Sequence, residues 1–124
     1  MPLAEAVRLL EAVSEPNRLR ILAVLYDGRM CVCELCAALG LKQSVMSQHL
    51  RVLRDRGLVE HRKDGLWVDY ELAPAALRGT KGRILRSLLR EVEQDESVRR
   101  DRREASKVDR MGLCRRRGAP SASR

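Results

Sequence analysis

The chain has 124 residues and a formal net charge of +8, which fits one basic domain. Hydrophobic residues make up 44%, but phenylalanine is absent, so the core must be built from Leu, Val, Ile and Ala. The longest apolar run, Ile21–Tyr26, is far shorter than the roughly 20 residues that a membrane span needs. No secretory signal is visible, so we expect a cytoplasmic protein with reduced cysteines and no membrane partner.

The positive charge is unevenly spread. Residues 1–94 carry 15 basic and 12 acidic side chains, whereas residues 95–124 carry 10 and 5. An excess of this kind favours a polyanionic partner, most simply nucleic acid. Residues 94–124 alternate in charge with few apolar side chains, which predicts a basic, disordered tail after a domain of residues 1–93.

Helices are predicted for most of that domain. Apolar residues at helical spacing indicate helices over residues 3–13, 14–26, 32–39, 44–56 and 75–93. Ser14 and Ser44 are the predicted N-caps of the second and fourth helices. Gly40 and Gly57 are predicted to end the third and fourth. In the first helix, Leu3, Ala6, Val7 and Leu10 form the expected buried stripe.

The period changes after the fourth helix. Alternation over residues 66–72 predicts a half-buried strand, and Asp64-Gly65 predicts a tight turn that pairs it with residues 58–63. A mainly α chain with one β-hairpin in this order is typical of a winged helix-turn-helix domain. The last helix, residues 75–93, has a wide apolar stripe. It could fold onto the domain's own core, but we favour a homodimer through the first and last helices.

The helix over residues 44–56 is the candidate recognition helix. Its outward side chains are short, amide or basic groups that suit base edges and phosphates, and residues 42–63 have a net charge of +4. Together with the hairpin they predict a surface for double-stranded operator DNA. The predicted DNA-binding residues are Lys42, Gln43, Ser44, Ser47, Gln48, His49, Arg51, Arg62 and Lys63.

Three cysteines lie within six residues at the start of the third helix: Cys31, Cys33 and Cys36. Soft thiolates favour thiophilic ions, and a helix N-terminus near arginines favours the thiolate form. On a helix Cys33 and Cys36 share a face, whereas Cys31 can join them only if the backbone around it is not helical. Ligand capture would then distort the helix that packs beside the recognition helix.

Other roles for these thiols remain open. Cys33 and Cys36 have the spacing of a redox pair, although no strand–helix–strand context surrounds them. A small thiol enzyme or an oxidant sensor is therefore an alternative to a metal sensor. A structural zinc site would need a fourth ligand, and the distant Cys114 is the one remaining cysteine.

Four motifs in residues 1–93 resemble the ArsR/SmtB family of metal-sensing repressors. They are SEPNRLRIL at 14–22, CVCELC at 31–36, QSVMSQHL at 43–50 and GLVEHRKDGLWVDY at 57–70. The resemblance implies a homodimer that binds a palindromic operator without ligand and leaves it on binding metal.

Within this family the cysteine motif resembles that of arsenite and antimonite sensors. It implies As(III) or Sb(III) as inducer, with Cys31, Cys33 and Cys36 as ligands, and control of arsenic-resistance genes. Residues 75–93 lack the Asp and His ligands of the family's zinc sensors, and residues 1–30 lack the cysteines of its cadmium and lead sensors. The alternative within the family is another soft metal (Cd, Pb or Zn) at the same cysteines.

Overall fold

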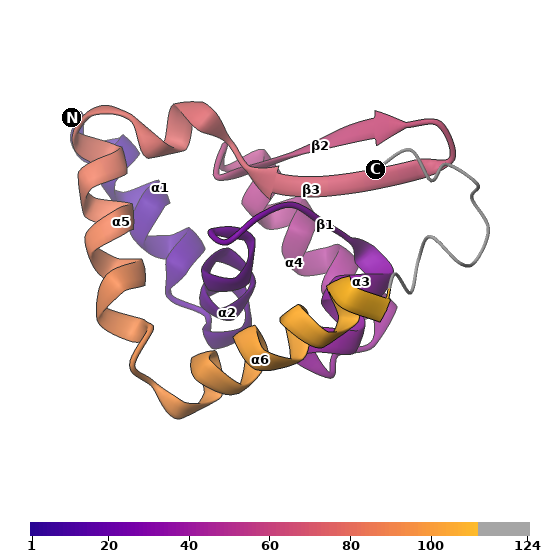
Figure 1. Ribbon diagram of the computed structural model, residues 1–124. Helices are drawn as coiled ribbons and strands as arrows, with labels where there is room; N and C mark the ends of the chain where they lie inside the picture. The colour runs from indigo at the N-terminus through magenta and orange to yellow at the C-terminus, as the bar shows by residue number, and fades with distance from the viewer. Residues whose placement is uncertain (112–124) are drawn as a thin grey trace.

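The computed structural model describes residues 1–111, which form a mainly helical fold with one small antiparallel sheet (Figure 1). The elements in chain order are α1 (Leu3–Val13), α2 (Pro16–Leu25), β1 (Met30–Cys31), α3 (Val32–Leu39), α4 (Gln43–Asp55), β2 (Val59–Asp64), β3 (Trp67–Leu72), the 3-10 turn η1 (Pro74–Leu77), α5 (Gly79–Val92) and α6 (Glu96–Met111). Three helices, a recognition-type helix and a hairpin follow one another in the predicted winged helix-turn-helix order. No helix among the described residues is long and apolar enough to cross a membrane.

The core is aliphatic and is centred on α2. Ile21 and Leu22 are fully buried, and α3, α4 and α5 each turn an apolar face toward them. From α4 this face consists of Met46, Leu50 and Leu53, which recur at helical spacing as predicted. Burying these side chains supplies much of the driving force for folding in a chain that has no phenylalanine.

Two helix starts differ from prediction by one or two residues. The N-cap of α2 is Glu15, whose Oε1 accepts the Arg18 N–H at 2.9 Å, and Pro16 follows as the first helical residue. Ser14 instead ends α1. Helix α4 begins at Gln43 with Lys42 as N-cap, two residues before the predicted cap Ser44.

Helix α1 has the predicted bounds but a different buried face. Leu9, Ala12 and Val13 are buried against the core, whereas Leu3, Val7 and Leu10 are exposed. The helix therefore has one apolar stripe that packs against the core and a second one that faces solvent.

The sheet contains a strand that the alternation did not predict. Strand β1 pairs with the side of β3 that β2 does not occupy, with Met30 opposite Tyr70 and Cys31 opposite Asp69. Consequently Asp69 is buried rather than facing solvent, with Arg29 Nε at 3.9 Å. The hairpin turn is one residue later than predicted, because Gly65, at φ +67°, begins a two-residue Gly65-Leu66 loop.

Residues 96–111 form a helix, so the prediction of disorder from residue 94 onward is wrong over this range. Val98, Asp101 and Val108 are buried on one side of α6, which packs against α2 and α3 (Figure 1). Their spacing of three and seven residues fits one helix face. The rest of the predicted tail, including Cys114, lies outside the described residues.

Gly82, in the first turns of α5, provides the first testable prediction. A Cβ at this position would overlap the backbone carbonyl of Leu77 in η1. Helix propensity alone predicts that Gly82→Ala stabilises the protein by about 1 kcal/mol. Because the obstacle is backbone, we expect a net loss of about 1–3 kcal/mol in the free energy of unfolding.

Urea titration followed by circular dichroism measures this change. Ser87→Ala is the matched control, because Ser87 is exposed on the same helix. Equal or greater stability of Gly82→Ala would show that η1 moves aside readily.

Candidate functional site

The outer face of α4 is polar and open to solvent. Buried Met46, Leu50 and Leu53 anchor the helix, so the positions between them must face outward. The predicted DNA-binding side chains that are exposed on or just before α4 are Lys42, Gln43, Ser44, Ser47, Gln48 and Arg51. The fold thus brings these six onto one accessible segment of the dimensions that a major groove admits.

The hairpin provides the second basic surface. Arg62 and Lys63 are exposed on β2. Arg62 Nη2 donates to Glu71 Oε2 across the hairpin at 2.9 Å, so its charge is partly neutralised in the free protein. Leu66 is 81% exposed in the turn.

His49 does not join this surface. Its side chain is only 14% exposed, and Nε2 lies 3.9 Å from Glu15 Oε1 at the start of α2. The structure therefore does not support the prediction that His49 contacts DNA. Two of the basic residues that contribute to the net charge of residues 42–63 also bind other parts of the chain. Arg54 hydrogen-bonds to His61, and Arg56 hydrogen-bonds to Glu11 and to the Arg8 carbonyl.

The three clustered cysteines lie across a strand–helix junction. Cys31 has extended backbone angles in β1 and is the N-cap residue of α3, whereas Cys33 and Cys36 are one turn apart within the helix. The non-helical backbone that three converging thiols require is thus already present at Cys31. Cys33 is exposed, Cys36 is half-buried, and both are free thiols. Cys31 is disulfide-bonded in this structure.

Burial raises the pKa of the Cys36 thiol, and the nearby Cys33 adds to the rise. The expectation of a stabilised thiolate therefore does not hold at Cys36. Among residues 1–111 no three Cys, His, Asp or Glu side chains form a ready-made metal site. A ligand that needs all three sulfurs would have to draw them together.

Glu34 is a residue of this segment that the sequence reasoning missed. It is buried, and its Oε1 accepts the Cys31 N–H at 3.0 Å. This contact ties the first turn of α3 to the cysteine that precedes it. The three-residue spacing between Cys31 and Glu34, that of a capping box, was the signal that could have identified it.

Comparison with known proteins identifies this arrangement. The family model described as "Bacterial regulatory protein, arsR family" matches residues 15–61, from the cap of α2 to the middle of β2. The transcriptional activator HlyU of Vibrio cholerae is 44% identical over 75 residues, which are 60% of this chain and 69% of that protein. The chain belongs to the ArsR family.

The structure of Vibrio cholerae HlyU superposes on this ArsR-family chain with a TM-score of 0.62 and 40% identity, covering 71% of this chain and 91% of that one. A homodimeric winged helix-turn-helix domain from Mycobacterium bovis, described as a possible ArsR-family regulator, has a TM-score of 0.62 at 28% identity, covering 75% and 82%.

An arsenical resistance operon repressor of Escherichia coli K12 is also similar to this ArsR-family chain, with 42% identity over 69 residues. These residues are 55% of this chain and 59% of the repressor, so the likeness covers about three-fifths of that relative's length. The fold is therefore that of a winged helix-turn-helix regulator, and these named relatives are transcriptional regulators rather than enzymes.

Proposed function

We propose that this ArsR-family chain is a cytoplasmic transcriptional repressor of arsenic-resistance genes that As(III) or Sb(III) releases from operator DNA. The observation that carries this proposal is the position of Cys31, Cys33 and Cys36. They span the junction between β1, which pairs with the hairpin strand β3, and α3, which precedes the recognition helix. Ligand capture there acts on both DNA-binding elements.

For DNA binding, exposed polar groups of α4 enter the major groove, and Arg62 and Lys63 contact phosphates. Dimerisation through α1 and α5 would present two such surfaces to a palindromic site. The basic side chains supply affinity, whereas the amide and hydroxyl groups of α4 supply sequence preference.

For ligand binding, the donor set fits a soft ion. Cys33 is exposed and can capture an ion first, and Cys36 lies on the same helix face one turn later. Cys31 completes the set once it is reduced. Sulfur donors of this kind favour a thiophilic ion over a hard one.

Fluorescence anisotropy of the reduced protein on the DNA upstream of its own gene tests the whole proposal. Arsenite, antimonite, cadmium, lead and zinc are added in parallel, at fixed salt. Release by arsenite or antimonite is the expected result. Release only by another metal would leave the repressor and change its inducer, and binding unaffected by all five would contradict metal sensing.

An oxidant sensor is the second candidate, because Cys31 is disulfide-bonded in this structure. Peroxide added to the same complex separates the two functions. Reversible release by peroxide, with arsenite inert, would favour the oxidant sensor.

Gln48 provides a test of how the protein recognises the DNA sequence. It is exposed on α4, and an amide that binds an adenine edge is worth about 1–3 kcal/mol of discrimination. We expect Gln48→Ala to weaken operator binding by roughly tenfold or more and binding to unrelated DNA by less. Lys63→Ala is the contrasting variant, because the loss of a phosphate contact should weaken binding to the operator and to unrelated DNA equally. Equal losses of affinity for the operator and for unrelated DNA would show that Gln48 contacts the DNA backbone and not the bases.

A further inference from the structure

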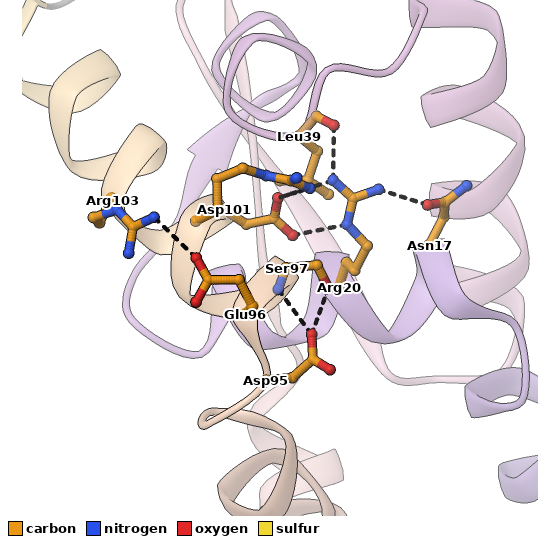
Figure 2. A network of polar contacts seen from close by, with 9 residues as sticks. Asn17, Arg20, Leu39, Asp95, Glu96, Ser97, Asp101 and Arg103 are labelled. Atoms are coloured by element: carbon orange, nitrogen blue, oxygen red, sulfur yellow. Dashed lines mark hydrogen bonds and ion pairs between the residues drawn. The ribbon is translucent and has the colours of Figure 1, made fainter.

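Arg20 of α2 lies at the centre of a polar network that joins α2, α3 and α6 (Figure 2). Its Nε donates to Asp101 Oδ2 and its Nη2 to Asp101 Oδ1, both at 2.8 Å. The Asp101 side chain is 1% exposed, so this is a bidentate ion pair largely withdrawn from water. The hydrogen bonds that Arg20 donates to Asp101 raise the pKa of the guanidinium, which stays charged.

The same guanidinium also reaches the end of α3. Nη2 donates to the Leu39 carbonyl at 2.8 Å, and Nη1 donates to Asn17 Oδ1 at 2.8 Å. Leu39 is the last residue of α3, where carbonyls lack helical partners and a positive charge is favourable. Arg20 therefore caps α3 from outside, with Asp101 fixing the plane of the guanidinium.

Leu39 lies immediately before the turn of the helix-turn-helix. Gly40 follows in the left-handed conformation, at φ +70°, and α4 begins at Gln43. The N–H groups of Gly40 and Leu41 both donate to the Cys36 carbonyl, which closes the end of α3. This short connection leads directly into α4.

Helix α6 extends the contact along α3. Asp101 lies near the C-terminal end of α3, and Ala105 and Ser106 line a cavity with Met30, which precedes its N-terminus. The two helices thus run antiparallel. The seven steps from Asp101 to Val108 rise about 10 Å along α6, which matches the seven steps of α3 from Val32 to Leu39.

We propose that Arg20 and Asp101 are positioning residues for DNA recognition: α6 supplies the carboxylate that holds Arg20 on the Leu39 carbonyl and so fixes the α3–α4 turn. This assignment goes beyond the α4 and hairpin contacts and rests on the proposed DNA binding. It gives α6 a role in operator affinity without any contact between α6 and DNA.

The double variant Arg20→Met/Asp101→Leu separates positioning from folding. Replacing both members of a buried ion pair with apolar residues is often neutral or stabilising, whereas removing one leaves a buried charge. We expect an unfolding midpoint near that of the wild type. The Leu39 carbonyl nevertheless loses its donor, so amide exchange at Gly40 and Leu41 should accelerate by about tenfold, the worth of one charge-assisted hydrogen bond.

Operator affinity should fall by a similar factor of about ten, with less than a twofold change on unrelated DNA. Glu96→Gln/Arg103→Met is the matched control, because it removes an exposed pair at 3.5 Å on the same helix. Both of its readouts should stay at wild-type values.

Unchanged exchange at Gly40 and Leu41 in a folded double variant would overturn the positioning role. Unchanged operator affinity would overturn it equally. If the wild type itself does not prefer the operator, the proposed function fails, and the exchange rates still decide the role of Arg20. Should the double variant not fold, Asp101→Asn, which keeps one acceptor oxygen, should give an intermediate exchange rate.

Discussion

Cys33→Ser should bind the operator as the wild type does and no longer be released by arsenite. Cys33 is exposed near the start of α3 and lies outside the polar surface of α4 and β2. Serine is nearly isosteric, so the packing of α3 and the position of α4 should be retained. The variant loses the most accessible soft donor of the cluster, and the two remaining sulfurs lie on opposite sides of the strand–helix junction.

The expected effect is loss of the coupling between ligand and DNA. Such couplings are typically about 1–3 kcal/mol, or roughly 5–150-fold in operator affinity. Linkage makes the effect reciprocal, so operator DNA should weaken arsenite binding to the wild type by the same factor and leave the variant unaffected. Anisotropy in both directions measures both halves of this prediction.

Ala37→Ser is the control for Cys33→Ser. Ala37 is exposed on the same helix, so this variant adds a hydroxyl to α3 without removing a thiol. It should be released at the wild-type arsenite concentration. Release of Cys33→Ser at that concentration would remove Cys33 from the ligand set and leave the three-thiol mechanism without support.

Leu10→Glu should convert a dimer into a monomer and abolish tight operator binding. Leu3, Val7 and Leu10 form a solvent-facing stripe on α1, and Ile84 is exposed on α5. Figure 1 places both helices at the end of the molecule away from the hairpin turn. Covering these side chains with a second copy removes apolar area from water, and a carboxylate in that interface would be buried without a partner.

Sedimentation equilibrium measures the change as a fall from twice the 14.1 kDa chain mass to that mass. Leu66→Glu is the matched control, because Leu66 and Leu3 are both 81% exposed but Leu66 lies in the hairpin turn. It should leave the dimer intact. A Leu10→Glu protein that remains dimeric would place the interface on another surface.

Local patterns in the sequence predicted most of the fold. Helical spacing with a glycine stop predicted α3, and the Asp64-Gly65 turn signal predicted the hairpin to within one residue. In both cases neighbouring residues decide the conformation. The six exposed DNA-binding candidates on or just before α4 could be predicted in the same way. Helical spacing shows which residues of α4 are buried, and the residues between them must face outward.

The features that were missed depend on contacts between distant residues. Asp101 is buried because Arg20, 81 positions away, pairs with it. No helical period indicates such a partner, so α6 resembled a solvated, charged tail. The burial of Asp69 also depends on a distant segment, because β1 pairs with β3 from a remote part of the chain. His49 faces inward because Glu15 begins the neighbouring helix.

The two-residue strand β1 has a mechanical consequence. Met30 and Cys31 are hydrogen-bonded partners of β3, and the next residue begins α3, so this short strand joins the hairpin directly to the helix before the turn. A displacement of Cys31 would act on β3 through their strand pairing and on α3 through the adjoining peptide bond. One bound ion would therefore disturb groove and backbone contacts in a single step, with no need for a separate signal to each.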